Sequence, residues 1–191
     1  MIKRQILFIW IIILSPFLSL FFLVQLASFE FFGPLPSLQQ LEDPKSNLAT
    51  EIISEDGKVL GKYFFENRTK VEFDEISDNL INALIATEDI RFKNHSGIDV
   101  RALFRAILGA IKGDVSSGGA STITQQLAKM LFTEKPATGV QRVLQKLKEW
   151  VISVQLEKRY TKNEILTMYL NRFDWVNNAV GIESASKVYF N

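Results

Sequence analysis

The first feature along the chain is a long apolar run that begins close to the N-terminus. Residues Ile6–Ala27 are mostly isoleucine, leucine and phenylalanine, and no charge interrupts them. As a helix these 22 residues extend about 33 Å, which exceeds the roughly 30 Å of a bilayer's hydrocarbon core. A cleaved signal peptide usually has an apolar core of only about 7–15 residues and a small-x-small cleavage site, which Leu26-Ala27-Ser28 lacks. The run therefore predicts an uncleaved transmembrane anchor.

The charges beside this anchor predict its orientation. Lys3 and Arg4 are the only charged residues in positions 1–29. Basic residues favour the cytoplasmic side of a membrane, so we expect a single-pass protein whose N-terminus is cytoplasmic. Everything after Phe29 is then expected on the far side.

The pattern after the anchor predicts a short β-hairpin and then helices. Residues 49–54 and 58–65 read as strands on either side of Glu55-Asp56-Gly57, where Asp-Gly favours a tight hairpin turn. Val71–Phe73 is a candidate for a further short strand. From Ile76 onward, helical periodicity dominates.

Two apolar stripes mark the predicted core of the helical region. The first is expected to be one buried stripe and comprises Val100, Leu103, Phe104, Ile107, Leu108 and Ile111. The second comprises Val140, Val143, Leu144, Leu147, Val151 and Val154. Thr161 and Glu164 indicate a capping box at the start of a later helix.

These elements predict a mainly α-helical protein with four parts. The parts are a cytoplasmic start and transmembrane anchor over residues 1–29, a linker over 30–50, a β-hairpin segment over 51–75 and a helical domain over 76–191. The linker contains Gly33-Pro34-Leu35-Pro36-Ser37 and Pro44, a composition that breaks both helix and strand.

The composition excludes several kinds of chemistry. The 191 residues include no cysteine and one histidine, which excludes a disulfide scaffold, thiol catalysis and a zinc site with several histidines. A net charge of +1 argues against a nucleic-acid binder. Residues 129–162 are the exception, because eight basic against three acidic side chains give +5 there. Such a patch suits an anionic head group near a membrane, although ion pairs along a solvated helix give the same composition.

Two carboxylate segments are the candidates for acid–base chemistry. Glu88-Asp89 follows an apolar helix and precedes a loop, a setting that suits a general acid or base, although solvated charges at a helix end are the commoner explanation of such a pair. Glu149 shares a helix face with Arg142 and Lys146, which we expect to keep it ionised. His95, alone of its kind, is typical of a hydrogen-bonded structural residue.

The string Gly118-Gly119-Ala120-Ser121-Thr122-Ile123-Thr124-Gln125-Gln126 joins glycines to hydroxyl and amide side chains ahead of an apolar helix. Backbone N–H groups at a helix start can receive phosphate oxygens, and Lys129 lies close enough in sequence to assist. An ordinary N-cap formed by Ser121 is the simpler alternative.

Four blocks follow one another in the helical region. They are Glu88-Asp89-x-x-Phe92-x-x-His95-x-Gly97-x-Asp99, then Gly119-Ala120-Ser121-Thr122-Ile123-Thr124-Gln125-Gln126-Leu127-Ala128-Lys129, then Lys146-x-x-Glu149, and finally Lys162-x-x-Ile165-Leu166-x-x-Tyr169-Leu170-Asn171. Over residues 51–191 the chain resembles the peptidoglycan glycosyltransferases, family 51 of the glycosyltransferases. That family includes monofunctional enzymes and the first catalytic domain of class A penicillin-binding proteins.

The resemblance implies a lysozyme-like α-helical domain that is half-embedded at the outer face of a bacterial cytoplasmic (inner) membrane, on its periplasmic or extracellular side. It implies polymerisation of lipid II, an undecaprenyl-pyrophosphate-linked disaccharide-peptide, into β-1,4-linked glycan strands of the cell wall. Glu88 would be the general base for the acceptor 4-hydroxyl, and Glu149 would lie beside the departing pyrophosphate. The residues implied to bind substrate are Asp89, His95, Ser121, Thr122, Gln125, Gln126, Lys129, Arg142 and Lys146. A divalent cation such as Mg²⁺ near Glu149 is left open.

The chain also departs from the family pattern. Gln145 stands where the third block usually carries arginine, although Arg142 lies one turn earlier, and Met130 replaces a usual asparagine. The sequence ends at Asn191, before the family's fifth block. We therefore expect a C-terminally truncated domain, from the N-terminal part of a class A penicillin-binding protein or from a monofunctional transglycosylase.

Two other functions stay open at this point. A lysozyme-like enzyme that cleaves glycan needs one catalytic acid and a saccharide groove, but it has no use for the second block or the cationic helix face. The non-enzymatic alternative is an inactive remnant that binds lipid II. The expected partners are lipid II, the nascent glycan strand, the bilayer and other cell-wall synthesis and division proteins, and no nucleic acid.

Overall fold

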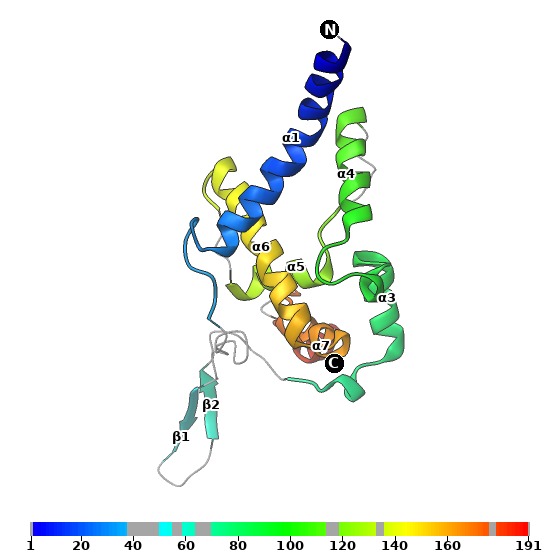
Figure 1. The fold of residues 1–191 in the computed structure, drawn as a ribbon. Coiled ribbons are helices and arrows are strands. Elements are labelled where there is room, and N and C mark those ends of the chain that lie inside the picture. The colour runs from blue at the N-terminus through cyan, green and yellow to red at the C-terminus, as the bar shows by residue number, and fades with distance from the viewer. Residues whose placement is uncertain are drawn as a thin grey trace.

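The protein is a group of helices joined to one small antiparallel sheet (Figure 1). The computed structural model describes residues 2–37, 50–54, 59–63, 70–113, 119–132, 136–175 and 179–190. Its elements are α1 (Ile2–Ser28), β1 (Thr50–Ile53), β2 (Val59–Tyr63), the 3-10 turn η1 (Phe73–Glu75), α3 (Asp78–Glu88), the 3-10 turn η2 (Phe92–Asn94), α4 (Val100–Lys112), α5 (Ile123–Phe132), α6 (Gly139–Arg159), α7 (Lys162–Arg172) and α8 (Ile182–Phe190). The predicted mainly α-helical class is confirmed, while the four-part division of the chain stays a prediction.

The predicted β-hairpin is present as two paired strands. Thr50 of β1 lies opposite Tyr63 of β2 in an antiparallel register, with an irregularity after Ile52. The turn predicted at Glu55-Asp56-Gly57 lies outside the described residues, as does Pro44 of the linker.

The further strand predicted at Val71–Phe73 is wrong. Residues from Phe73 onward form the turn η1, and the backbone of Val71 bonds instead to a side chain of α7. The Asn171 amide accepts a hydrogen bond from Val71 N–H and donates one to Val71 O, each over 2.9 Å. Because one amide satisfies both backbone groups, this segment needs no partner strand.

The core lies where α5, α6 and α7 meet. Its fully buried side chains come from all three helices and from η2, and include Phe92, Ile123, Leu127, Ile152, Leu156, Ile165, Leu166 and Leu170. The capping box predicted at Thr161 is confirmed, because its side chain accepts from Glu164 N–H and the Glu164 carboxylate accepts from Thr161 N–H. The backbone N–H and the hydroxyl of Thr161 both donate to the Glu164 carboxylate, and these two hydrogen bonds lower the pKa of that carboxyl. The cap fixes the start of α7 one turn before Ile165, the first residue of this helix that is buried in the core.

Helix α1 is the predicted membrane anchor. Within Arg4–Ser28 the most apolar stretch of 18 residues has a mean hydropathy of 2.7 and none of that stretch is buried, and among the described helices this is the one that is long and apolar enough to cross a bilayer. Its last turns pack on α6, where Ala27 is buried against Leu147 and Val151. This contact joins the anchor directly to the helical domain.

The apolar stripe of α4 is a helix face as predicted, but the prediction that it is buried is wrong. Val100, Phe104 and Ile111 are 69%, 58% and 76% exposed. The reason is the direction of the helix, because α4 extends toward the top of Figure 1, away from α7, as α1 does. On the opposite face of α4, Gly109 is buried.

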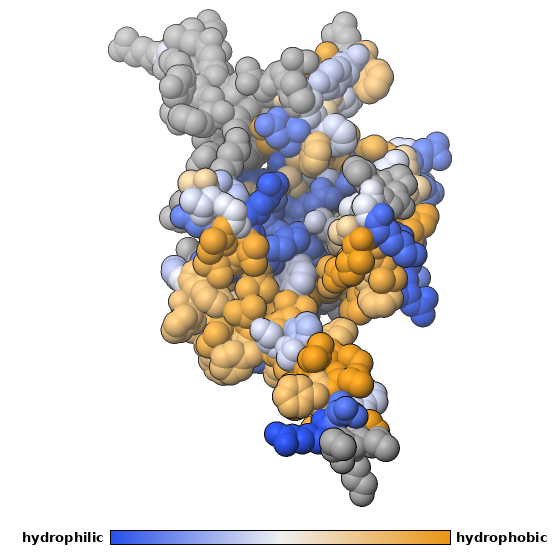
Figure 2. All heavy atoms as spheres, turned by 90° about the horizontal axis from the view of Figure 1, so that it is seen from above, coloured by the Kyte–Doolittle hydropathy of each residue, from blue (hydrophilic) through white to orange (hydrophobic). Residues whose placement is uncertain are grey.

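The second stripe, on α6, is buried only in its later part. Val140 and Val143 are exposed, whereas Leu147 and Val151 are buried. The change occurs because the end of α1 covers α6 from Leu144 onward. Seen from above, hydrophilic side chains occupy a recessed centre between two hydrophobic groups (Figure 2).

Candidate active site

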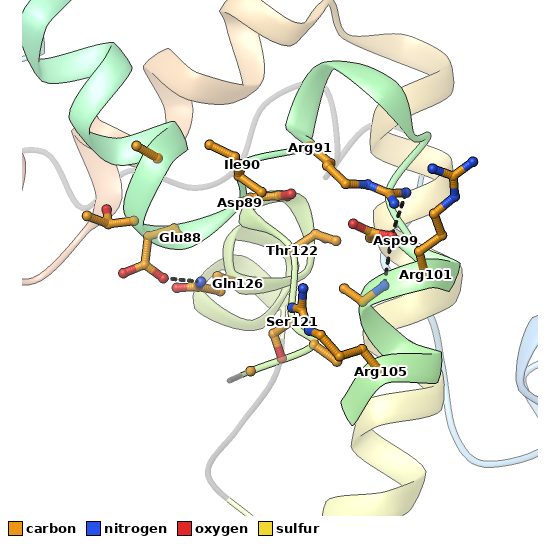
Figure 3. Close-up of a pocket in the computed structure, with 15 residues that line it drawn as sticks. Glu88, Asp89, Ile90, Arg91, Asp99, Arg101, Arg105, Ser121, Thr122 and Gln126 are labelled. Atoms are coloured by element: carbon orange, nitrogen blue, oxygen red, sulfur yellow. Dashed lines mark hydrogen bonds and ion pairs between the residues drawn. The ribbon is translucent and has the colours of Figure 1, made fainter. Parts of the chain in front are cut away.

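Two pockets adjoin at the start of α5 and together contain most of the predicted site residues. The first has a volume of about 540 Å³ and includes Glu88, with Arg101 and Arg105 of α4 (Figure 3). The second, of about 700 Å³, lies along α6 and includes Glu149. Ser121 and Gln126 line both pockets. Glu88 and Glu149 therefore line two pockets that adjoin at Ser121 and Gln126.

Glu88 is the last residue of α3 and its carboxylate is exposed to the first pocket. The helix ends there because Asp89 leaves the helical conformation, with φ −159° and ψ 72°. Glu88 Oε2 accepts a 2.7 Å hydrogen bond from Gln126 Nε2 (Figure 3). An exposed carboxylate held by one neutral donor can still accept a proton from a bound hydroxyl.

Glu149 has the opposite surroundings, because it is buried and paired with a cation. The residue is 4% exposed on α6. Its Oε2 lies 2.9 Å from Lys146 Nζ, and its Oε1 accepts a 3.1 Å hydrogen bond from Gln145 Nε2. Lys146 Nζ also donates to Ser121 Oγ over 2.9 Å, so the ammonium joins α6 to the start of α5. The predicted pairing of Glu149 with Lys146 is confirmed.

Arg142 and Lys129 line the second pocket as well. Arg142 is exposed and forms no ion pair with Glu149 in the part of the chain that the structure describes. The position where the third block departs from the family, Gln145, supplies an amide donor to Glu149 instead of a charge. Of the two cations expected beside Glu149, only Lys146 contacts it among the described residues, and the Gln145 amide supplies the second contact.

Comparison with known proteins bears on what this pair of pockets does. A family model described as Transglycosylase matches residues 56–191. The chain belongs to the transglycosylase family. It is 38% identical to penicillin-binding protein 1A of Pseudomonas aeruginosa over 82% of this chain, and 38% identical to penicillin-binding protein 1A of Escherichia coli, also over 82%. Against penicillin-binding protein 1F of Bacillus subtilis the identity is 37% over the whole chain.

The family match confirms the resemblance carried by the four sequence blocks. Neither it nor these relatives support the glycan-cleaving alternative. The transglycosylase chain spans 18% of the length of the two 1A proteins and 26% of that of the 1F protein.

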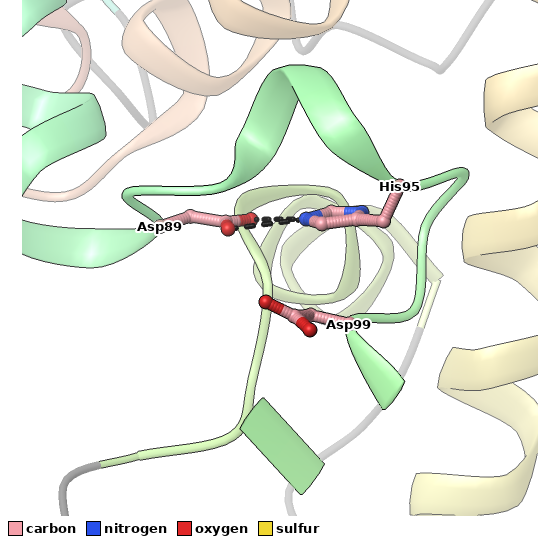
Figure 4. Close-up of side chains that lie close together, drawn as sticks. All are labelled: Asp89, His95 and Asp99. Carbon is pink, nitrogen blue, oxygen red and sulfur yellow. Dashed lines mark hydrogen bonds and ion pairs between the residues drawn. The ribbon is translucent and has the colours of Figure 1, made fainter. Parts of the chain in front are cut away.

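In this member of the family the rest of the first block forms a buried scaffold behind Glu88. Asp89 is 8% exposed, and its carboxylate forms a 3.0 Å hydrogen bond with His95 Nε2 (Figure 4). The same carboxylate accepts a 3.2 Å hydrogen bond from the N–H of Ile123. His95 lines neither of the two pockets. Asp89 thus ties the loop that follows Glu88 to the first residue of α5.

Gly97 continues this scaffold. Its carbonyl accepts hydrogen bonds from Thr122 Oγ1 at 2.7 Å and from Gln125 Nε2 at 3.1 Å. Gly97 has φ +90°, and a Cβ at this position would lie 2.9 Å from the backbone of Ser153 on α6. Only glycine combines that backbone conformation with so close an approach. Thr122 and Gln125 are buried, and both of these hydrogen bonds hold their side chains against the Gly97 loop.

Lys162, the first residue of the fourth block, holds the same loop from the other side. Its ammonium donates to His95 O at 2.7 Å and to Glu157 at 2.8 Å, and it lies 4.1 Å from the centre of the Phe92 ring. The contacts of Lys162 with His95 and Phe92 join residues far apart in sequence, so the blocks alone did not predict them. These contacts give Lys162, His95 and Phe92 a structural role, whereas the sequence showed them only as parts of a motif.

The described residues include one group that could offer three metal ligands, Asp89, His95 and Asp99, whose ligand atoms lie within 4.8 Å of one another (Figure 4). These atoms already have partners in the protein. Asp99 forms a 2.9 Å ion pair with Arg91 and caps α4 through Ala102 N–H. A guanidinium placed against the cluster disfavours a metal ion there.

Arg101 and Arg105 are site residues that the sequence analysis missed. Both extend from α4 into the first pocket (Figure 3). Neither forms an ion pair within the described part of the chain. Their spacing of four residues, beside an apolar stripe, is the signal that could have found them, because it places two cations on one helix face.

Proposed function

We propose that this transglycosylase polymerises lipid II into β-1,4-linked glycan strands, with inversion at the donor anomeric carbon and release of undecaprenyl pyrophosphate. One observation carries the proposal. An exposed carboxylate, Glu88, and a carboxylate paired with a cation, Glu149, lie in pockets that meet at Ser121 and Gln126.

The arrangement suits an inverting displacement. In such a reaction the acceptor hydroxyl and the leaving group occupy opposite sides of the anomeric carbon. The acceptor sugar would occupy the first pocket, where Glu88 takes the proton of the 4-hydroxyl while its oxygen forms the new bond to carbon. The bond from that carbon to the pyrophosphate breaks at the same time, and the negative charge leaves toward the second pocket. Ser121 and Gln126 would contact the donor where the pockets join.

The second pocket supplies cations to the leaving pyrophosphate. Lys146 is oriented by Glu149 and Ser121, and Lys129 and Arg142 line the same pocket. Preorganised charges of this kind stabilise negative charge that develops in the transition state. A divalent cation such as Mg²⁺ near Glu149 stays a prediction. Both oxygens of this carboxylate already bond to Lys146 and Gln145, so the ion would take its oxygen ligands mainly from the pyrophosphate.

The first pocket carries its own positive charge. An acceptor lipid also bears a pyrophosphate, and Arg101 and Arg105 would bind it while its sugar reaches Glu88. Asp89, His95, Thr122 and Gln125 would act by holding this pocket in shape, since their side chains bond to the protein.

The membrane placement is part of the proposal. Helices α1 and α4 extend in the same direction (Figure 1), and the apolar side chains of α4 are exposed. We propose that α1 spans the cytoplasmic membrane and that the apolar side chains of α4 enter its outer face. Lys3 and Arg4 would keep the N-terminus cytoplasmic. Burial of the apolar residues of α4 in lipid would gain about 25 cal/mol per Å² of apolar surface. Association with other cell-wall synthesis and division proteins stays a prediction.

A spin label tests the placement of α4, because the chain contains no cysteine and one introduced thiol is unique. In vesicles, a nitroxide on Ile111→Cys is expected to be more accessible to oxygen dissolved in lipid than to a water-soluble nickel chelate. A label on Arg105→Cys, on the pocket side of the same helix, is the matched control and is expected to show the reverse order. Equal access of the chelate to both labels would contradict insertion of α4.

Substrate consumption tests the reaction. The purified protein in vesicles is expected to convert labelled lipid II into long glycan with release of undecaprenyl pyrophosphate, and to leave preformed peptidoglycan unchanged. Gel separation of the products and thin-layer analysis of the lipid measure the two. Shortening of preformed peptidoglycan would favour the lysozyme-like function instead. Binding of lipid II without polymer would favour the inactive remnant.

A further inference from the structure

Tyr169 lies directly behind the amide that holds Glu88. Its hydroxyl donates a 3.1 Å hydrogen bond to Gln126 Oε1, and Gln126 Nε2 donates a 2.7 Å hydrogen bond to Glu88 Oε2. The three side chains come from α7, α5 and α3. They form one directed chain of hydrogen bonds that ends on the carboxylate proposed as the base.

Packing fixes the position of Tyr169. The residue is 1% exposed, and its ring centre lies 5.3 Å from that of Phe173. Neighbouring residues of α7, Ile165 and Leu166, are buried in the same core. A buried tyrosine hydroxyl requires a hydrogen-bond partner, and Gln126 Oε1 is the one that Tyr169 has among the described residues.

The hydroxyl stays a donor under working conditions. Burial raises the pKa of Tyr169 well above its usual value, and the negative charge of Glu88 raises it further. Tyr169 therefore remains protonated through neutral and moderately alkaline pH.

A protonated hydroxyl at this place decides the orientation of the Gln126 amide. The side chain has an oxygen end and a nitrogen end of nearly equal size. With the oxygen facing Tyr169, the NH₂ group faces Glu88 and donates to it. In the reverse orientation the amide oxygen would face a carboxylate, and two acceptors would lie against each other without a hydrogen between them. The second carboxylate oxygen, Oε1, has no hydrogen bond to any described residue.

We propose that Tyr169 is a positioning residue for Glu88. By orienting the Gln126 amide, its hydroxyl holds Glu88 Oε2 in place and leaves Oε1 to take the proton of an acceptor sugar hydroxyl. The inference rests on the proposed function, because only a reaction that uses Glu88 as a base depends on this arrangement. Tyr169 itself is buried and acts through Gln126.

Tyr169→Phe tests the inference, because it removes the hydroxyl and keeps the ring in the core. A hydrogen bond between neutral groups makes a modest net contribution, so loss of the one from Tyr169 to Gln126 is expected to lower kcat for lipid II polymerisation by about two- to tenfold. KM is expected to change less than about twofold, because the acceptor pocket is intact. Tyr189→Phe is the matched control. It also removes a tyrosine hydrogen bond, to Trp175 O, but on α8, and it is expected to leave kcat unchanged.

A double-mutant cycle separates positioning from general support of the core. In a Gln126→Ala background the hydroxyl has no amide to orient, so Tyr169→Phe is expected to cause no further loss of kcat. Full additivity of the two losses, or a Tyr169→Phe protein with the kcat of the original, would overturn the inference while the proposed function stands. A starting protein that forms no glycan from lipid II would overturn the proposed function, and the inference with it.

Discussion

Glu88→Gln is expected to lower the rate of lipid II polymerisation by about 10²–10⁴-fold, the usual contribution of a general base. The substitution replaces a carboxylate by an amide of the same shape. Gln126 Nε2, which now donates to Glu88 Oε2 at 2.7 Å, can donate to the amide oxygen of the new side chain. The change therefore removes the ability to take up a proton and leaves the surroundings in place.

The fold is expected to tolerate this change. Glu88 is exposed at the end of α3 and takes part in no ion pair that the structure shows among the described residues. Thermal unfolding in detergent is expected to match that of the unaltered protein. Glu183→Gln is a suitable control, because it neutralises a carboxylate on α8 that pairs with Lys187 at 2.8 Å, outside both pockets. Normal glycan lengthening by Glu88→Gln would show that another group is the base.

Lys146→Met is expected to lower kcat by about 10²–10³-fold, the loss typical of removing one preorganised group that stabilises transition-state charge. The ammonium lies 2.9 Å from both Glu149 Oε2 and Ser121 Oγ. Its side chain is 37% exposed to the second pocket, whereas that of Glu149 is 5% exposed. The cation can therefore reach a bound pyrophosphate, and Glu149 serves to orient it.

The same substitution is expected to destabilise the protein. Removal of Lys146 leaves the buried Glu149 charge without its cation, which typically costs about 3–5 kcal/mol in the free energy of unfolding. A second variant separates this effect from catalysis. Adding Glu149→Gln to Lys146→Met removes the stranded charge, and stability is expected to return toward that of the original protein.

Activity is not expected to return in that double variant. The pyrophosphate would still lack its ammonium, so glycan formation stays low although the protein unfolds at nearly its original temperature. Denaturant unfolding in detergent and the yield of polymer from labelled lipid II measure the two properties on the same sample. Recovery of polymer yield together with stability would show that Lys146 acts only in the fold.

Local features were predictable because their partners are close in sequence. The anchor is an uninterrupted apolar run, the cap at the start of α7 joins Thr161 to Glu164, and the Lys146–Glu149 ion pair spans one helical turn. Each involves residues within a few positions of one another, where helix geometry alone determines the distance. The prediction needed no knowledge of the tertiary fold.

The surroundings of the first block were not predictable in that way. Asp89 and His95 read as candidate substrate ligands, yet the structure turns them toward each other and toward the start of α5. Lys162 reaches the same loop across 67 positions of sequence. A sequence motif records that residues are needed together, but not whether each faces a ligand or the protein.

By itself, the sequence determined the membrane anchor, the helices and the contrast between a carboxylate without nearby charge and one beside cations. Only the tertiary structure decided that the stripe of α4 is exposed and that Tyr169, Gln126 and Glu88 form one chain over separations of 43 and 38 residues. The physical reason is that helical periodicity states which side chains share a face. What that face meets depends on how distant helices pack.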